Sequence, residues 1–268
     1  EWWERNPQEW CKYQTAWGHP EIFRYVINEP EFAPHHTQSD FVAWLCEVAD
    51  RLADAGIKGV LGNWAIGTYE PEDVENGTFD PLLRKLDQYH GFHYLGMHEY
   101  TLSALPFGVG QMPVTDLLDP SKIHPDNWVK SLPIARVNVN GKMVLPGYWH
   151  LLRSAWLVIR AQELGLKIPQ IWLTECFWDQ VDVGGNPNVK DELISRYGIP
   201  APATAIRGIV ALENVWQAYW GALGWDKERA AFEQLKWVNS IYPDNYIGFC
   251  LFSWTSDPQW KDKNGVDV

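Results

Sequence analysis

The fold is decided by the stretch FRYVINEP at residues 23–30. It begins with a short run of mostly apolar and aromatic side chains, which is typical of a strand buried within a sheet. The run ends at Asn28-Glu29-Pro30, where polar side chains and a proline indicate a turn. Ser39 or Asp40 can then cap an amphipathic helix that runs from Phe41 to about Asp54. The stretch therefore predicts a strand, a polar loop and a helix in succession.

The same succession recurs along the rest of the chain. Strand-like apolar runs occupy about residues 57–61, 92–97, 170–173 and 246–252, and helical patterns occupy about 80–89, 148–164, 208–222 and 227–240. A further segment, residues 135–144, alternates around Asn140-Gly141 and predicts a β-hairpin. Apolar strands that alternate with helices predict a parallel sheet, and ligands bind such sheets at the carboxyl ends of the strands.

Composition excludes several classes of protein. The chain has 268 residues, of which 46% are hydrophobic, and this apolar content favours a folded domain over a disordered one. The net charge of -12 disfavours nucleic acid as a partner, because binding a phosphate backbone needs clustered basic residues. The sequence has no uncharged apolar run of about 18 residues, so we expect no membrane span. The 17 tryptophans are an unusually high number and suggest flat aromatic surfaces for a ligand.

The cysteines and histidines give no sign of a metal or cofactor site. The 4 cysteines lie far apart, without a C-x-x-C pair, and Cys46 and Cys250 stand in apolar patterns that predict buried thiols. No cluster of Cys and His has the spacing of zinc ligands, so we expect neither a metal nor a cofactor. The compartment stays open, although an extracellular or cell-surface setting is compatible with the sequence.

Two glutamates, Glu29 and Glu175, each follow directly after a buried strand. A parallel barrel would direct both side chains into one cleft. Two carboxylates in one cleft are what glycoside hydrolysis needs, because one protonates the leaving oxygen while the other attacks or activates water. The alternative is that each glutamate caps the following helix or pairs with a nearby arginine.

His98 and Tyr100 are two residues apart on one predicted strand and therefore face the same way. Either could donate a hydrogen bond to Glu175 and orient it, although both could instead be core residues. Glu99 lies between them and should point to the opposite face, where a salt bridge or a supporting role is expected.

Several tryptophans are placed where they could contact a sugar. Trp254 at the end of the last strand could form a floor under a sugar ring, and Trp64, Tyr69 and Trp178 stand on predicted loops of the same rim. Other tryptophans recur at helical spacing and are expected in the core, namely Trp44, Trp156, Trp216, Trp220 and Trp237.

Four of these strand ends together resemble the clan A, or 4/7, retaining glycoside hydrolases, TIM barrels that include cellulases and mannanases. Asn28-Glu29-Pro30 resembles the Asn-Glu-Pro that ends strand four of that clan, and Thr174-Glu175 is similar to the end of its strand seven. His98-Glu99-Tyr100 is similar to the His-x-Tyr on strand six of family-five members, and Trp254 to the tryptophan that closes strand eight.

The resemblance implies a retaining double displacement on a β-linked oligosaccharide or polysaccharide. It implies the following roles: Glu29 as acid/base, Glu175 as nucleophile, Asn28 holding the sugar 2-hydroxyl, Tyr100 contacting the nucleophile, His98 supporting that group, and Trp254 as the floor. Independently of the resemblance, the rim positions of Trp64, Tyr69 and Trp178 suggest that they line neighbouring subsites. The carboxyl groups should then lie about 5–5.5 Å apart.

The resemblance covers about residues 20–256, which correspond to strands four to eight. Strands one to three would need about 90 residues, and 22 residues precede Phe23. We therefore expect one partial catalytic domain over residues 1–268. Its fold would be a (β/α)8 TIM barrel that lacks its first three strands in this chain. A further segment or domain of the same polypeptide could supply these strands. The alternative function is a non-catalytic glycan-binding or structural module with a glycosidase-like cleft. A serine hydrolase is a weaker alternative, because no Gly-x-Ser-x-Gly motif is present.

Overall fold

The computed structural model describes residues 6–30, 32, 36–65, 68–101, 134–146, 152–178 and 239–251, together with residues 224, 229, 232, 233 and 236. At residues 100, 101, 177, 178 and 249–251 it describes the backbone alone.

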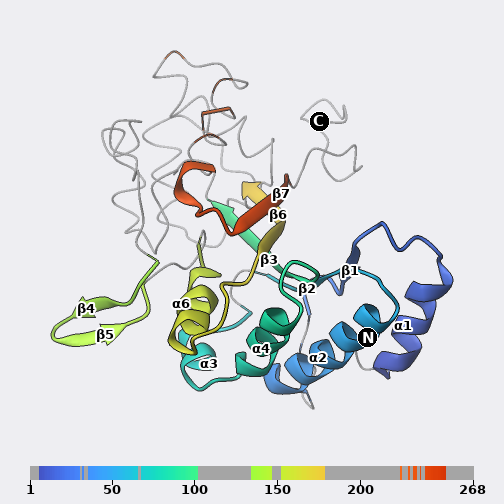
Figure 1. Cartoon of the computed structure of the whole chain (residues 1–268). Coiled ribbons are helices and arrows are strands. Elements are labelled where there is room, and N and C mark those ends of the chain that lie inside the picture. Colours follow the sequence, from blue (N-terminus) through green and yellow to red (C-terminus); the bar gives the residue numbers. More distant parts are fainter. Residues whose placement is uncertain are drawn as a thin grey trace, which may run out of the picture.

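The centre of the described structure is a sheet of five parallel strands (Figure 1). Its strands, in spatial order, are β1 (Arg24–Val26), β2 (Gly59–Trp64), β3 (Tyr94–Thr101), β6 (Ile171–Trp178) and β7 (Tyr246–Leu251). Each strand pairs in parallel with the next one along this series, so the spatial order follows the chain. The predicted parallel sheet, with five strands separated by helices, is therefore confirmed.

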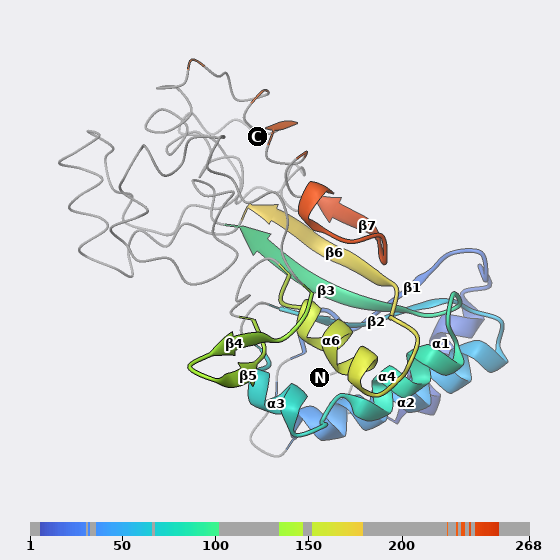
Figure 2. The ribbon, with the colours of Figure 1, turned by 60° about the vertical axis from the view of Figure 1, so that its left-hand side comes forward.

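The described helices lie along one face of this sheet (Figure 2). They are α1 (Pro7–Ala16), α2 (Gln38–Asp54), α3 (Pro71–Glu75), α4 (Asp80–Gln88) and α6 (Ala155–Glu163). α2 presents an apolar stripe at helical spacing, including Phe41, Leu45 and Val48, and these side chains are fully buried. The core thus forms between this layer of helices and the sheet. None of the described helices has both the length and the apolar character needed to cross a membrane.

The start of α2 differs from the expectation that Ser39 or Asp40 is its cap. Thr37 is the N-cap, its side chain accepts a hydrogen bond from the Asp40 backbone N–H, and the Asp40 carboxylate accepts one from the Thr37 N–H. This reciprocal arrangement is a capping box, in which the acidic residue stands three positions after the cap. Asp40 therefore belongs to the first turn of the helix.

The other helical predictions are met in their described parts. α4 lies where it was expected. α6 occupies the second part of the segment predicted as helix at 148–164, and residues 229, 232, 233, 236, 239 and 240 are helical. The helix predicted at 208–222 lies outside the described residues. α3 was not predicted; Pro71 at its first turn and a reciprocal cap between Glu70 and Asp73 explain how so short a helix starts in a turn-rich stretch.

The predicted hairpin is confirmed as β4 (Val137–Val139) and β5 (Lys142–Val144). Asn140 and Gly141 both have positive φ, at 52° and 84°, which the two-residue turn requires. The hairpin is attached to the helices by Arg136, whose guanidinium pairs with Glu75 of α3 at 2.8 Å and with Glu163 of α6 at 2.5 Å.

The cysteines and the helix tryptophans largely follow the sequence expectation. Cys11 and Cys176 are buried, and Cys46 is half-buried. Burial raises the pKa of the Cys46 thiol to about 11. Trp44 and Trp156 are buried in the core as predicted, at 8% and 0% exposure. The side chain of Cys250 and the tryptophans at positions 216, 220 and 237 lie outside what the structure describes.

Glu99 of β3 attaches α6 to the sheet. Its side chain points away from His98, as strand alternation predicts, and is fully buried. The carboxylate accepts hydrogen bonds from the backbone N–H groups of Leu152 and Ser154, both at 2.7 Å, from the Tyr242 hydroxyl at 2.5 Å, and from the Ser154 hydroxyl. Burial raises the pKa of the Glu99 carboxyl above its ordinary value, although these hydrogen bonds act in the opposite direction. The salt bridge that we considered for Glu99 is replaced, among the described residues, by neutral donors.

Candidate active site

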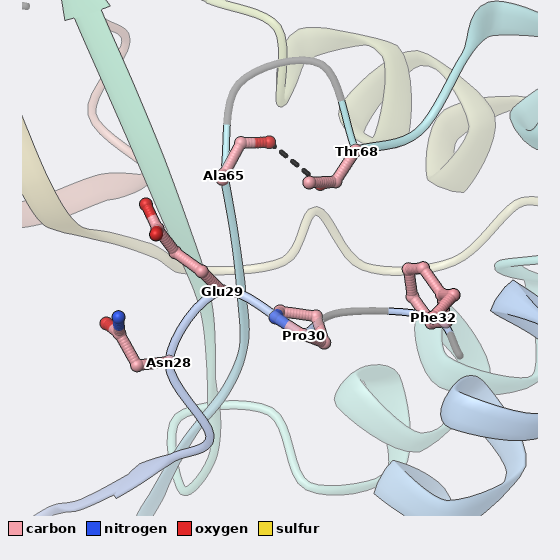
Figure 3. Close-up of a pocket in the computed structure, with 6 residues that line it drawn as sticks. All are labelled: Asn28, Glu29, Pro30, Phe32, Ala65 and Thr68. Carbon is pink, nitrogen blue, oxygen red and sulfur yellow. Dashed lines mark hydrogen bonds between the residues drawn. The ribbon is translucent and has the colours of Figure 1, made fainter. Parts of the chain in front are cut away.

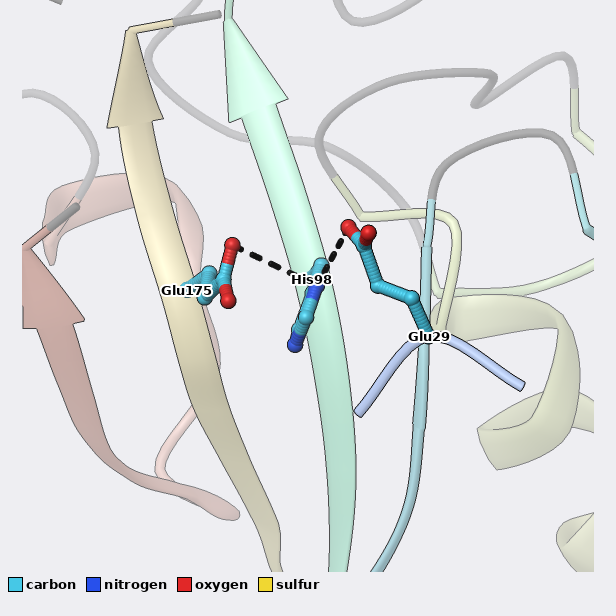
Figure 4. A group of neighbouring side chains, drawn as sticks. All are labelled: Glu29, His98 and Glu175. Atoms are coloured by element: carbon cyan, nitrogen blue, oxygen red, sulfur yellow. Dashed lines mark hydrogen bonds and ion pairs between the residues drawn. The ribbon is translucent and has the colours of Figure 1, made fainter. Parts of the chain in front are cut away.

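Three side chains that the sequence places far apart meet on one face of the sheet (Figure 4). The expectation that Glu175 follows its strand directly is wrong, because β3 and β6 run further than predicted, to Thr101 and Trp178, so that His98 and Glu175 lie within them. Glu29 follows β1, His98 belongs to β3, and Glu175 belongs to β6, where it stands beside His98 in the strand register. In Figure 4 the imidazole of His98 lies between the two carboxylates. The parallel sheet therefore brings together the two glutamates that were predicted to act as a pair.

The contacts within this group are close. His98 Nδ1 lies 3.0 Å from Glu29 Oε1 and 3.5 Å from Glu175 Oε2. The His98 side chain has no exposed surface, the Glu175 side chain is 18% exposed, and the Glu29 side chain is 46% exposed. A buried imidazole thus holds two carboxylates, one partly buried and one open to solvent.

The same group contains the described side chains that could surround a metal ion. One ligand atom from each of Glu29, His98 and Glu175 lies within 4.8 Å of the other two. Nδ1 contacts both carboxylates at hydrogen-bond and ion-pair distances, so a metal ion placed here would have to displace the proton that joins them. The arrangement as it stands suits the sharing of protons between two carboxyl groups and an imidazole.

The backbone around Glu29 is strained into place. Ile27 and Glu29 have positive φ angles of 59° and 43°, which is unusual for a β-branched residue above all. Residues in such conformations persist only where their surroundings hold them, and they concentrate at functional sites. The chain turns sharply here, so that the Glu29 side chain leaves the end of β1 toward His98.

Asn63 of β2 holds this turn and was not singled out by the sequence pattern. Its amide nitrogen donates to the carbonyls of Val26 at 2.9 Å and Ile27 at 2.7 Å, and its amide oxygen accepts from the Thr174 hydroxyl at 2.9 Å. Asn63 is fully buried, and these hydrogen bonds connect the backbone before Glu29 with Thr174, the residue before Glu175. The sequence feature that could have identified Asn63 is its polar side chain within an otherwise apolar strand.

Gly96 of β3 makes room for the Asn63 amide. A Cβ atom at position 96 would lie 2.0 Å from Asn63 Oδ1, which is far inside contact distance. A glycine within a strand often marks such a close approach. The site therefore depends on one strand residue that has no side chain.

Tyr25 of β1 is a second residue that the sequence pattern did not single out. Its hydroxyl donates to Asn28 Oδ1 at 2.7 Å and lies 2.6 Å from His98 Nε2. The two rings are roughly parallel, at an interplanar angle of 29°. Strand alternation was the available signal, because it places Tyr25 on the opposite face of β1 from the buried Val26.

The prediction that Trp64 and Tyr69 line sugar subsites is wrong. Both side chains are buried, at 0% and 1% exposure, and they pack edge to face against each other and against Phe79. The Trp64 indole N–H donates to Gln38 Oε1 at 3.2 Å. β2 runs three residues further than predicted and its register shifts between Gly62 and Trp64, so Trp64 is a strand residue that faces the helices.

The remaining predicted site residues are placed by their backbone alone or not at all. Tyr100 lies two residues beyond His98 on β3, and Trp178 is the last residue of β6, paired in register with Thr101. Their side chains, and the whole of Trp254, lie outside the described residues. The structure thus brings together Asn28, Glu29, His98 and Glu175 among the predicted set.

A pocket of about 770 Å³ adjoins Glu29 (Figure 3). It is lined by Asn28, Glu29, Pro30, Phe32, Ala65 and Thr68. In Figure 3 the polar side chains of Asn28 and Glu29 lie on one side and the ring of Phe32 on the other. A pocket of this volume, with an aromatic ring opposite polar groups, is of the size and character that bind a small organic molecule or one or two sugar units.

Comparison of the chain with known protein families, curated proteins and solved structures finds nothing that matches it. The resemblance of its strand ends to clan A is therefore carried by those motifs alone.

Proposed function

We propose that this chain is part of a (β/α)8 glycosidase that cleaves a β-linked oligosaccharide or polysaccharide with retention of configuration. The observation that carries the proposal is the meeting of Glu29 and Glu175 on either side of His98, with carboxylate oxygens within 4.8 Å of each other. Retaining enzymes hold their two carboxyl groups about 5–5.5 Å apart, whereas inverting enzymes leave about 6.5–9.5 Å for a water molecule. The close spacing supports retention.

The order of the strands supports the same assignment. The five strands lie side by side in chain order, as strands four to eight of a barrel would. Glu29 then follows the first of these strands, and His98 and Glu175 belong to the third and fourth, which correspond to strands four, six and seven in the clan A resemblance. Catalytic groups at the carboxyl ends of several strands are the general arrangement of barrel enzymes.

In this proposal Glu29 acts as acid/base. Its side chain is open to solvent and lines the pocket, so the leaving group would occupy the space beside Asn28 and Phe32. The proton of the Glu29 carboxyl passes to the glycosidic oxygen as the bond from that oxygen to the anomeric carbon breaks. Glu29 afterwards removes a proton from the water that enters the emptied pocket.

Glu175 acts as nucleophile. A carboxylate oxygen attacks the anomeric carbon and forms a glycosyl ester, which the activated water then hydrolyses to return Glu175 to its ionised form. The partly buried position of Glu175 beside His98 limits its rotation and keeps one oxygen aimed at the cleft. Two inversions at the anomeric carbon give net retention.

The experiment is an assay of the whole chain against a panel of chromogenic β-glycosides and soluble glucans, mannans and xylans. Glu175→Gln and Glu29→Gln should each lower kcat at least about 10³-fold, since residues of such a pair act as a unit. Glu47→Gln, which alters an exposed glutamate paired with Arg51 on α2, is the matched control and should keep full activity. NMR of the first-formed product should show the β-anomer.

Two results would contradict the proposal. Binding of glycans without hydrolysis in the unchanged protein would favour the alternative of a non-catalytic binding module. Hydrolysis that persists in Glu175→Gln would remove the nucleophile from the mechanism.

A further inference from the structure

We propose that Tyr25 is a positioning residue that holds His98 in the tautomer with its proton on Nε2, so that Nδ1 favours the protonated form of Glu29. The inference rests on the proposed function for its consequence in catalysis. Its structural part, the tautomer of His98, can be tested without any activity.

The directions of the hydrogen bonds follow from the chemistry of the three groups. An amide oxygen only accepts, so the Tyr25 hydroxyl gives its single hydrogen to Asn28 Oδ1 across 2.7 Å. The hydroxyl oxygen must then accept from its other close neighbour, His98 Nε2, at 2.6 Å. Nε2 therefore carries a hydrogen.

This tautomer determines what the two glutamates meet. A neutral imidazole with hydrogen on Nε2 presents a lone pair at Nδ1, 3.0 Å from Glu29 Oε1. Their contact is a hydrogen bond only when Glu29 supplies the proton, and that is the state that an acid catalyst needs before the reaction. The other tautomer would direct an N–H at Glu29 and Glu175 together and would stabilise both in the ionised form.

The groups around His98 leave the choice of its tautomer to Tyr25. The charged groups that face the imidazole from the described elements are Glu29 after β1 and Glu175 of β6, while Tyr25 and Asn28 are neutral. From β2 the nearby polar group is the neutral amide of Asn63, whose oxygen is engaged by Thr174. The His98 side chain has no exposed surface, so water cannot readily replace the tyrosine hydroxyl at Nε2.

The first test is the ¹⁵N spectrum of the histidine rings in the full chain, which has 8 histidines. The His98 signals are assigned by their loss in His98→Gln. In the unchanged protein Nε2 should have the shift of a protonated nitrogen and Nδ1 that of an unprotonated one, and Tyr25→Phe should reverse the two. Unaltered signals from the other histidines show that the variant is folded, as expected because the ring of residue 25 is kept.

The second test is the pH dependence of kcat/KM. In Tyr25→Phe the midpoint of the alkaline limb, where the acid catalyst loses its proton, should move about one pH unit lower, because the N–H of the other tautomer then stabilises ionised Glu29. Tyr13→Phe, at an exposed tyrosine of α1, is the control and should leave the profile unchanged. A purely structural role would lower the rate at every pH without moving the limb.

The inference is overturned if His98 shows the same tautomer with and without the Tyr25 hydroxyl, or if Nδ1 is the protonated nitrogen in the unchanged protein. An alkaline limb that stays in place while the tautomer reverses would overturn the catalytic consequence. Absence of any hydrolysis would instead count against the proposed function, and the NMR result would still decide the role of Tyr25.

Discussion

Replacing Glu99 should reveal how strongly a buried carboxylate holds α6 to the sheet. The Glu99 side chain accepts from the backbone N–H groups of Leu152 and Ser154 and from the hydroxyls of Ser154 and Tyr242. In Glu99→Ala the hydroxyls can turn to each other or to Tyr246, which already lies 2.6 Å from Ser154 Oγ. The backbone N–H of Ser154 cannot turn and loses its acceptor, whereas the N–H of Leu152 loses its shorter hydrogen bond and keeps a longer one to the Tyr242 hydroxyl at 3.2 Å.

The expected cost follows from those two groups. The Ser154 donor left without a partner costs about 1–3 kcal/mol and the shorter bond lost by Leu152 about 1 kcal/mol, so Glu99→Ala should lower the free energy of unfolding by about 3 kcal/mol. At about 2–4 °C for each kcal/mol in a chain of this size, the melting temperature should fall by about 6–12 °C. Glu99→Gln keeps the volume and one acceptor oxygen and should cost about half as much.

The same residue should make stability depend on pH. Burial raises the pKa of Glu99 above its ordinary value of 4.5. Below that value the carboxyl is protonated in both states. As the pH rises above it, the unfolded chain releases the proton while the folded chain retains it, so stability falls until the pH passes the raised folded pKa. The side chain at position 99 of Glu99→Gln does not titrate. The difference in free energy of unfolding between the unchanged protein and Glu99→Gln should therefore become smaller as the pH rises.

The assay is urea unfolding, followed by tryptophan fluorescence, between about pH 4 and about pH 8. The other carboxyl groups titrate equally in the unchanged protein and in Glu99→Gln, so their effect cancels in the comparison. Glu47→Gln is the control for removal of an exposed glutamate and should change the free energy by less than about 1 kcal/mol. Stability of Glu99→Ala equal to that of the control would refute the proposed attachment. A pH dependence shared by Glu99→Gln and the unchanged protein would refute its titration.

Three further predictions concern the site and its support. Asn63→Ala should lower the free energy of unfolding by about 2–3 kcal/mol, because it removes the hydrogen bonds that hold the strained turn before Glu29. It should also reduce kcat more than it changes KM. Urea unfolding and steady-state kinetics measure the two effects, and an unchanged kcat would contradict the prediction. Trp64→Phe should lower the melting temperature, because the indole is buried in the core. Any change in KM should be the same for long and for short glycans. A KM that rises only for long glycans would show that Trp64 lines a sugar subsite. Dialysis against EDTA should leave hydrolysis unchanged, because Nδ1 of His98 is engaged by the proton of Glu29 and not by a cation. Loss of activity that a divalent cation restores would refute that arrangement.

Much of the fold could be predicted because its signals are local. The strand at FRYVINEP, the hairpin at Asn140-Gly141 and α4 after Asp80-Pro81 each depend on residues a few positions apart, and all three are present. The position of Glu29 directly after β1 also follows from a local pattern, whereas Glu175 lies within β6, which runs further than the pattern predicted. Parallel pairing then brings neighbouring strands into register along one sheet.

The supporting residues could not be predicted in the same way. Tyr25 contacts His98 across 73 positions of sequence, and Asn63 contacts Thr174 across 111. These contacts depend on the register between strands, which shifts between Gly62 and Trp64 and again between Met97 and His98. A shift of one residue moves a side chain to the opposite face of the sheet.

The sequence by itself determined the order of strands and helices and the association of Glu29 and Glu175 with two of the strands, because periodicity and turn residues act over short distances. Only the tertiary structure decided that the Trp64 indole belongs to the core, that Glu99 binds the start of α6, and that Tyr25 and Asn63 hold the residues around the glutamates. The physical reason is that a side chain's partner depends on its face and register, which are set when distant strands pair.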